Sequence, residues 1–400
     1  VHVWPDAVVA GEPVWVAFHS RDAGWDAAST GAIQVETDGG TAVQGDFPVA
    51  ATAVPVTYVT TDEARQTLVI HVQNRDATAH TVERLLVDGR DVLAADVACV
   101  PDATIAPGEA AMWTVLLCEP AALGDAWTVV VDYEDAATAV GVGRVIAPRF
   151  PTEAWNNTSD CPFPSGDADN YARLQEAGID TIYFHGGVCS ADKCDCDTFE
   201  ILNEEIPATD NLFALATWDL HQLDYTDTSG LAGFATGDES DGEIYDDESG
   251  KPNAWNKAKK SSAAWAKYPQ IPTFNGAMTN RNIGTFAGMA DVQGVDIYAA
   301  ACAPHITPFG SYPHLSTPYR YLRNARENHM PLATWLYSQG LAGTWNQDGL
   351  FGEVHVQPDP QEILVQALSV AAAGGKGLMY FQVAEDEAEH DWERWMAIAR

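Results

Sequence analysis

Basic residues are scarce in this 400-residue chain. Lys and Arg number 21 against 57 Asp and Glu, so the formal net charge is −36 at pH 7. A surface of this sign repels the phosphates of nucleic acids and of anionic membranes. We therefore expect no nucleic-acid partner, and a neutral or cationic partner is the better fit.

Long hydrophobic runs are missing as well. No segment approaches the roughly 18 to 20 consecutive apolar residues of a transmembrane helix, so we expect no insertion into a membrane. The first residues, VHVWPDAVV, lack the basic, apolar and small-residue regions of a signal peptide, and we expect any leader to have been removed. The sequence leaves the oligomeric state open.

Motifs of several enzyme classes are absent too. The sequence holds no GxGxxG, GxxxxGKS/T or GxSxG pattern, and its eleven histidines show neither HxH nor HExxH spacing. We therefore expect no nucleotide cofactor, no catalytic metal and no serine nucleophile of the hydrolase type.

Cysteine is limited to seven residues. Three of them crowd the segment GGVCSADKCDCD, which could be a soft-metal site, but the spacing matches no standard zinc pattern. We favour disulfides, with Cys302 left over, and disulfides would place the protein outside the cytoplasm, secreted or on the cell surface. The candidates are Cys161, Cys189, Cys194 and Cys196 near one another, and Cys99 with Cys118 as a second pair.

Residues 1–146 have the pattern of an all-β sandwich domain. Short runs such as TLVIHVQN, AMWTVLLC and AWTVVVDYE are rich in Val, Thr and aromatics, and turn residues separate them. LLVDGRDV carries an Asp-Gly hairpin signal, and TIAPGEAA enters its strand through a Pro-Gly turn. The histidines of this region, His19, His71 and His80, are expected to be surface or strand residues without a catalytic role. A packing or weak glycan-binding role suits this domain better than catalysis.

A change of rhythm at Ala147-Pro148-Arg149-Phe150-Pro151 marks a linker, which we place at 147–152. Beyond it, apolar runs alternate with helical or looped segments: EAWNN, TIYFHGG, LFALATWD, LAGFATGDE, IPTFNGA, GVDIYAA, PLATWLYSQ and KGLMYFQ. Eight parallel strands in residues 153–400 fit the roughly 250 residues of a (β/α)8 TIM barrel. Crossover helices are expected at Asp169–Ala177, Ala254–Lys267, Tyr319–Asn328 and Gln361–Ala373. The fold class is therefore α/β, a TIM barrel preceded by a sandwich.

Chemistry in such barrels gathers just past the carboxyl ends of the strands. The polar and aromatic residues expected there suit a carbohydrate, since rings stack on sugars while amides and acids bind hydroxyls. The predicted substrate-binding set is Trp155, Asn156, His185, Trp218, Asp219, Asn275, Asp296, Tyr298, Trp335, Tyr337, Gln339 and Gln382.

The segment LAGFATGDESDGE places two adjacent acids, Asp238 and Glu239, at the end of the fourth strand. With Asp296-x-Tyr298 after strand 6, a Trp in strand 7 and GGKGLMYFQ as strand 8, the chain resembles retaining (β/α)8 glycoside hydrolases over about residues 152–390. The resemblance implies that Glu239 is the general acid/base. Asp238 is expected to raise the pKa of Glu239 by like-charge repulsion.

The sequence departs from that resemblance at strand 7, where Gln339 stands in the place of a nucleophilic Glu. One explanation is substrate assistance on N-acetylhexosaminides: the Asp-Glu pair is similar to that of β-hexosaminidases, in which the Asp orients the 2-acetamido group. A second is that Glu239 works with Asp296 or Asp219. A third is that Gln339 replaces a Glu, or that the strand register is shifted. A non-catalytic glycan-binding protein is the alternative from another class.

Overall fold

The structure is a computed structural model of the whole chain, and it describes a large part of it. The described residues are 2–4, 15–17, 30–36, 42–48, 54–95, 97–99, 103–135, 138–145, 151–155, 172, 174–184, 202, 204, 206–217, 224–237, 240, 253–277, 286, 290–296, 319–323, 335–341, 345–349, 352–356 and 359–381.

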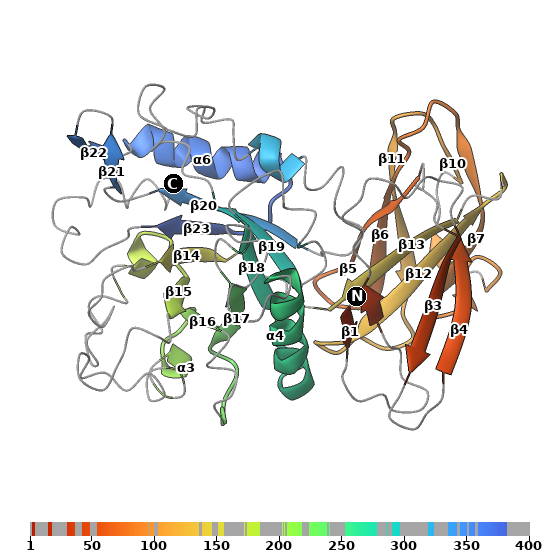
Figure 1. Cartoon of the computed structure of the whole chain (residues 1–400), viewed down its shortest axis with the longest axis horizontal. Coiled ribbons are helices and arrows are strands. Elements are labelled where there is room, and N and C mark those ends of the chain that lie inside the picture. Colours follow the sequence, from red (N-terminus) through yellow and green to blue (C-terminus); the bar gives the residue numbers. More distant parts are fainter. Residues whose placement is uncertain are drawn as a thin grey trace.

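Antiparallel sheets make up the first part of the chain (Figure 1). One sheet has the order β10-β7-β12-β13 with β8 beside β7, and another has the order β5-β6-β11-β9. Two hairpin-like pairs, β1-β2 and β3-β4, precede them. The strands are β1 His2–Trp4, β2 Trp15–Ala17, β3 Thr30–Glu36, β4 Ala42–Pro48, β5 Val56–Thr61, β6 Thr67–Gln73, β7 His80–Val87, β8 Arg90–Asp91, β9 Ala98–Cys99, β10 Thr104–Ile105, β11 Ala110–Leu116, β12 Ala126–Tyr133 and β13 Thr138–Arg144.

Alternation of apolar residues builds the sandwich core. In β6 every second residue is buried, and β12 shows the same alternation over its second half, so each strand turns one face inward. The largest fully buried side chain of this core is Trp113. The predicted Asp-Gly hairpin is confirmed: Asp88 and Gly89 have φ of 48° and 77°, and Val87 pairs with Arg90 across the turn.

Small residues let β13 approach β5. A Cβ at Gly141 would lie 2.3 Å from Cγ1 of Val56, and one at Gly143 would lie 2.6 Å from Val59. Glycine is therefore required here by the close approach of two strands, and it also makes the strand hard to recognise in the sequence TAVGVGR.

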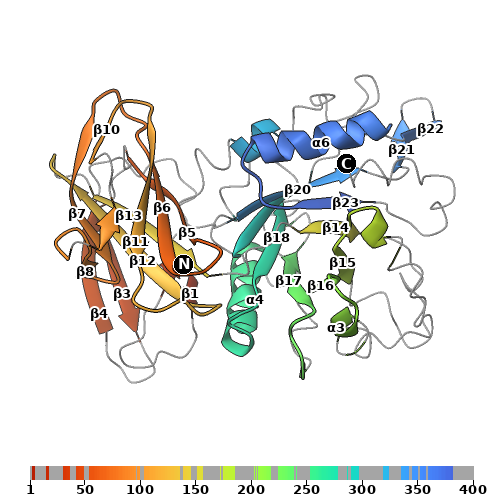
Figure 2. The same cartoon turned by 180° about the vertical axis from the view of Figure 1, so that it is seen from behind.

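Eight parallel strands follow in the second part of the chain (Figure 2). Their hydrogen-bonded order, β14-β15-β16-β17-β18-β19-β20-β23, closes on itself. Each of the eight predicted runs overlaps one of them, and five contain their strand in full. The strands are β14 Thr152–Trp155, β15 Thr181–Phe184, β16 Phe213–Thr217, β17 Leu231–Gly237, β18 Thr273–Ala277, β19 Val292–Asp296, β20 Trp335–Leu341 and β23 Leu378–Phe381. A separate antiparallel pair, β21 Trp345–Gly349 with β22 Gly352–Val356, lies between the last two.

Three helices of this part have described bounds: α3 Ile206–Ala208, α4 Asn253–Lys267 and α6 Pro360–Ala372. The last two match predicted crossover helices. α6 begins with a capping box, in which Asp359 accepts from the backbone of Glu362 and Glu362 accepts from that of Asp359. A cluster of apolar residues, including Ala154, Ile182, Val295 and Tyr380, is shared by strands and helices. Among the described helices, none is long and apolar enough to cross a membrane.

One arginine fastens the sandwich to the strand ring. Arg144 ends β13, its Nε lies 3.3 Å from Oδ1 of Asp291, and its Nη2 donates to the carbonyls of Pro269 and Ile271. Asp291 precedes β19 and also accepts from Trp265 of α4 and from the backbone of Thr273. The guanidinium lies 5.0 Å from the centre of the Trp265 ring. The sandwich therefore meets the ring at the amino ends of β18 and β19.

The expected disulfide between Cys99 and Cys118 is wrong. Cys118 is an exposed free thiol, and the register of β11 with β9 explains why. Cys99 lies opposite Thr114, four residues before Cys118. β11 ends at Leu116, so Cys118 lies beyond the part of β11 that pairs with β9. Cys161, Cys189, Cys194, Cys196 and Cys302 lie outside the described residues.

Candidate functional site

The carboxyl ends of the eight parallel strands form one rim of the ring, which we call the carboxyl rim. It consists of the last residues of the strands: Trp155, Phe184, Thr217, Gly237, Ala277, Asp296, Leu341 and Phe381. Several predicted site residues lie outside the described residues, namely Asn156, His185, Trp218, Asp219, Asp238, Glu239, Tyr298 and Gln382. For these, the roles given above stay predictions. The site is described below from the residues that neighbour them in the sequence.

The two residues that flank the Asp238-Glu239 segment, Gly237 and Ser240, are described. Gly237 is the last residue of β17. Ser240, on the other side, is buried and bonded through three groups: its backbone N–H donates to Gly276, its hydroxyl to Asn275, and its carbonyl accepts from Asn253. The segment that carries the acid pair is thus anchored to β18 and to the first residue of α4.

Asn275 lies in the middle of β18, and its amide is used inside the protein. Its Oδ1 accepts from Ser240 at 2.6 Å, and its Nδ2 donates to Oε1 of Gln293 at 3.3 Å. Gln293 in turn donates to the carbonyls of Asn275 and Gly294. The Asn275 side chain has no exposed surface. The prediction that Asn275 contacts substrate is therefore revised: the Asn275 side chain accepts the hydrogen bond of the Ser240 hydroxyl instead.

Asp296 is the last residue of β19 and is buried. Val295 packs in the cluster shared with the helices, so the alternation along the strand turns Asp296 toward the inside of the ring. This position suits the prediction that Asp296 takes part in the site, either in binding substrate or as a second carboxylate.

A single register row runs from Asp296 to the other end of the ring. Asp296 pairs with Gln339 of β20, Gln339 pairs with Met379 of β23, and Met379 pairs with Glu153 of β14. Asp296 ends its strand, whereas Glu153 is the second residue of its own. The row passes from the carboxyl end of β19 to the amino end of β14 because strands in a closed barrel are tilted and staggered.

The backbone register corrects one prediction in β20. Trp335 is the first residue of that strand and pairs with Val292, the first residue of β19. It lies six residues before the carboxyl end at Leu341, which corresponds to about 20 Å of strand. Trp335 therefore belongs to the amino end of the ring and not to the carboxyl rim. Tyr337 and Gln339 follow along the same strand, and Trp155 ends β14.

Glu153 is a buried acid that the sequence did not single out. Its side chain is 1% exposed, and neither carboxyl oxygen has a hydrogen-bond partner among the described residues. Burial raises the pKa of Glu153 well above its ordinary value of 4.5, and the nearby charge of Asp180 raises it further. A buried carboxyl group that ionises less readily than an ordinary glutamate therefore lies near the amino end of β14.

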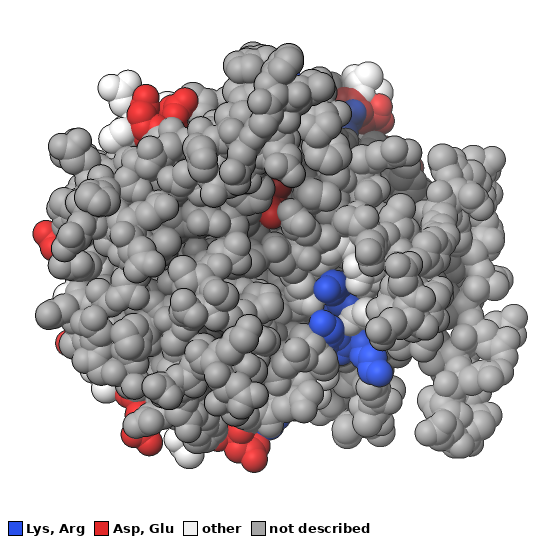
Figure 3. All heavy atoms as spheres, turned by 60° about the vertical axis from the view of Figure 1, so that its left-hand side comes forward, with Lys and Arg blue, Asp and Glu red and all other residues white. Residues whose placement is uncertain are grey.

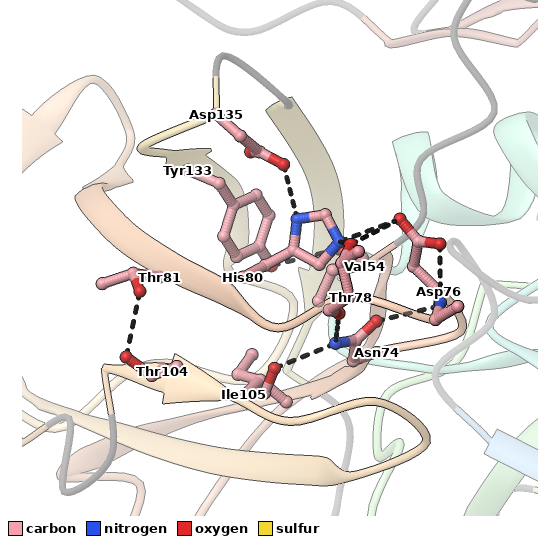
Figure 4. A network of polar contacts seen from close by, with 11 residues as sticks. Val54, Asn74, Asp76, Thr78, His80, Thr81, Thr104, Ile105, Tyr133 and Asp135 are labelled. Atoms are coloured by element: carbon pink, nitrogen blue, oxygen red, sulfur yellow. Dashed lines mark hydrogen bonds and ion pairs between the residues drawn. The ribbon is translucent and has the colours of Figure 1, made fainter.

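A second polar cluster lies in the sandwich, around His80 (Figure 4). Nε2 of His80 is 3.1 Å from Oδ2 of Asp76 and 3.3 Å from the hydroxyl of Thr78, and Nδ1 is 2.7 Å from Oδ2 of Asp135. The ring stacks edge-on against Tyr133, whose hydroxyl donates to Val54. An Asp, a His and a Thr in contact resemble the parts of a nucleophilic triad.

The geometry of this cluster indicates structure rather than catalysis. A triad needs one imidazole nitrogen free to accept the proton of the nucleophile, whereas both nitrogens of His80 face carboxylates. Asn74 closes the same loop by donating to Thr78 and to Ile105. His80, the first residue of strand β7 as the sequence suggested, therefore links the loop before β7 to the segment that follows β12.

Among the residues that the structure describes, no group of three or more His, Cys, Asp or Glu side chains could hold a metal ion. The supporting residues of the site, Ser240, Gln293 and Asn253, were missed in the sequence. A weak signal existed for two of them: Gln293 is a polar residue within the apolar run GMADVQGVD, and Ser240 directly follows the acid pair.

The chain matches no protein-family model, and no curated protein matches it. Solved structures do overlay on it. Beta-glucuronidase 2 of Bacteroides uniformis is 11% identical, with a TM-score of 0.40 over 82% of this chain and 45% of that one. A GH2 beta-galacturonidase from Eisenbergiella tayi is 9% identical, with a TM-score of 0.40 over 86% and 68%. A putative beta-galactosidase from Bacteroides fragilis is 12% identical, with a TM-score of 0.39 over 82% and 54%. The chain thus spans about half the length of the first and third of these structures.

Proposed function

We propose that this protein is a glycoside hydrolase that cleaves an oligo- or polysaccharide at the carboxyl rim of a (β/α)8 barrel, behind a β-sandwich domain at 1–146. The observation that supports it most is the anchoring of Ser240. An acidic segment in a merely solvated loop needs no support, whereas this one ends on a residue bonded through its N–H, hydroxyl and carbonyl. Such support is what holds a catalytic group in a productive geometry.

Glu239 is the general acid/base of this proposal, and Asp238 is its partner. In the substrate-assisted form, Glu239 gives its proton to the glycosidic oxygen as the bond to the anomeric carbon breaks. The oxygen of the substrate's 2-acetamido group forms the new bond to that carbon, while Asp238 accepts the hydrogen bond of the amide N–H. Water then opens the cyclic intermediate and returns a proton to Glu239. N-acetylhexosaminides are therefore the proposed substrates.

The test is turnover of a panel of chromogenic glycosides by the purified protein. The panel holds N-acetyl-β-hexosaminides, the matching glucosides and galactosides, and the glucuronides and galacturonides named for the similar structures. Glu239→Gln should lower turnover by about 10² to 10⁴, as expected for a lost proton-transfer catalyst. Glu176→Gln makes the same chemical change at an exposed position and should have no effect. An unchanged rate for Glu239→Gln on an unactivated substrate would contradict the role of Glu239.

A second mechanism is favoured by the inward position of Asp296 at the end of β19. In this alternative, Asp296 completes a two-carboxylate pair with Glu239, and plain hexosides are cleaved as well as acetamido sugars. Asp296→Asn would then abolish turnover on every substrate. Under substrate assistance it is Asp238→Asn that loses activity on acetamido sugars, and a thiazoline mimic of the cyclic intermediate inhibits. Binding without any turnover across the panel would instead indicate a glycan-binding protein. Under either function, we propose that this chain acts outside the cytoplasm.

A further inference from the structure

Glu153 differs from the other acidic side chains that the structure describes. On the face of the molecule shown in Figure 3, the described Asp and Glu side chains are dispersed over the surface. Among the described residues, the buried acids are Glu153, Asp291 and Asp296. Asp291 has Arg144 as its cation, whereas neither carboxyl oxygen of Glu153 has a hydrogen-bond partner within the described part of the chain. Glu153 is therefore a buried polar group that calls for a ligand.

The alternation along the strands turns Glu153 toward the inside of the ring. Its neighbour Ala154 packs in the apolar cluster that strands and helices share, so Glu153 lies on the opposite face of β14. By the same alternation Thr181 of β15 faces inward, because Ile182 belongs to that cluster. Glu153 and Thr181 are register partners. Their side chains therefore lie side by side on the inner face of two adjacent strands.

The other flank of Glu153 is apolar. Met379 of β23 is its register partner on that side, and Met379 faces inward because Tyr380 belongs to the shared cluster. A thioether is only a weak hydrogen-bond acceptor. Of the two register partners of Glu153, Thr181 is thus the one that offers a hydrogen-bonding side chain.

The hydroxyl of Thr181 has a defined orientation. It is fully buried and donates its proton to Oδ1 of Asp180 at 2.8 Å. The same oxygen accepts from the backbone N–H of Thr152 at 2.9 Å, which holds the acceptor in place. A hydroxyl has one donor and two lone pairs. Because the donor is used by Asp180, the Thr181 oxygen is available to a further donor as an acceptor.

The chemistry of Glu153 selects an uncharged ligand. Burial raises the pKa of Glu153 well above its ordinary value, so the carboxyl keeps its proton more readily than an exposed glutamate does. A protonated carboxyl has one O–H donor and one C=O acceptor. A small molecule that both donates and accepts satisfies both groups, whereas a cation would require the ionised form.

We propose that a water molecule binds inside the ring between Glu153 and Thr181 and links β14 to β15. The water accepts the O–H of the Glu153 carboxyl and donates one hydrogen to the C=O of the same group. Its second hydrogen goes to the hydroxyl oxygen of Thr181. These three hydrogen bonds are the usual number for a buried water.

The position of Phe274 is consistent with a ligand at this place. β18 is four strands away from β14 in the closed order, so the two strands face each other across the ring. A Cβ on Gly233 of β17 would lie 2.3 Å from Cε2 of Phe274. The end of the Phe274 ring therefore lies against the strand next to its own rather than across the ring toward Glu153. A single water needs a cavity of only about 10 to 15 Å³.

The experiment is ¹⁷O relaxation dispersion of water with the full chain, which counts buried water molecules of long residence time. Glu153→Met removes both hydrogen-bonding groups at nearly constant volume, so the count should fall by about one relative to the wild type. Glu153→Gln keeps a donor and an acceptor and should retain the count. Glu176→Met makes the same change as Glu153→Met at an exposed position and should also retain it.

Thr181→Val tests the other side of the bridge. It keeps the shape of the side chain and removes the acceptor, so the same water should be lost, and the double variant with Glu153→Met should lose no more than either single variant. A count that stays at the wild-type value in Glu153→Met would overturn the proposal.

A crystal structure of the wild type decides the question if a variant does not fold. It should show water density within hydrogen-bond distance of the Glu153 carboxyl and of Oγ1 of Thr181. A direct bond from Glu153 to a protein atom, or a metal ion in place of the water, would contradict the proposal. Neither readout involves turnover, so the outcome is independent of the function proposed above.

Discussion

Glu153→Gln tests the buried acid at the amino end of β14. Glutamine has the shape of a protonated glutamate and stays uncharged at every pH. Within the part of the chain that the structure describes, neither carboxyl oxygen of Glu153 has a hydrogen-bond partner, and the pKa is raised by burial first and by Asp180 second. The variant should therefore fold as the wild type does at low pH and should exceed it in stability as the pH rises.

The size of the effect follows from proton counting. Below about pH 4.5 the carboxyl of Glu153 is protonated in both the folded and the unfolded chain, so its ionisation takes nothing from the unfolding free energy. Above that pH the unfolded chain releases the proton while the folded chain keeps it. The wild type then loses about 1.4 kcal/mol of unfolding free energy per pH unit, relative to the variant, until the pH passes the folded pKa. Between pH 5 and 7 the difference should grow by up to about 2.7 kcal/mol.

The assay is equilibrium urea unfolding of both proteins at about pH 5, 6 and 7, with hydrogen exchange of peptides from β14 and β15 to identify the transition of the strand ring. All other titrating groups cancel in the difference between the two proteins. Asp180→Asn removes the neighbouring charge, so the folded pKa should fall and the pH-dependent window should narrow. A difference in stability that stays constant with pH would refute the reasoning, because a Glu153 that titrates as in the unfolded chain gives no slope.

Three further substitutions have expected outcomes. Arg144→Met leaves Asp291 buried without its cation and should destabilise the protein by about 3 kcal/mol in urea unfolding, whereas Arg84→Met, at the exposed pair with Asp132, should leave the unfolding midpoint nearly unchanged. Ser240→Ala removes the donor to the fully buried Oδ1 of Asn275 and should cost about 1 to 3 kcal/mol in the same assay, with the exposed Ser229→Ala as control; equal effects would contradict the anchoring role. Gly141→Ala places a methyl group against Val56 and should cost about 1 to 3 kcal/mol, measured by thermal and chemical unfolding, and addition of Val56→Ala should recover part of it; strictly additive losses would exclude the contact.

The strands were predictable wherever a strong local pattern exists. The alternation of β6 and the Asp-Gly turn before β8 are short-range signals, and the structure has both as expected. The eight apolar runs of the second half likewise each overlap a strand of the closed ring. β13 was not predicted, because the glycines that allow its approach to β5 interrupt the apolar alternation by which a strand is recognised.

The site was predictable only in outline. The acid pair after β17 is visible in the sequence, whereas Asn253, which donates to the carbonyl of the adjacent Ser240, belongs to a helix that begins more than ten residues later. Such contacts depend on how α4 packs, which no local pattern encodes. Trp335 was misplaced because an apolar run does not show where its strand begins, and Asn275 because its hydrogen-bond partners belong to two other segments.

The arginine that ends β13 has a consequence for how this architecture could change over time. Arg144 meets the carbonyls of Pro269 and Ile271 and the carboxylate of Asp291, all of which precede β18 or β19. The sandwich thus contacts the ring at the amino ends of its strands, while the acid pair follows the carboxyl end of β17 in the sequence. Loops that follow the carboxyl ends of the strands can therefore change in sequence without altering the contacts of Arg144. The two halves of the chain are in this sense free to evolve at different rates.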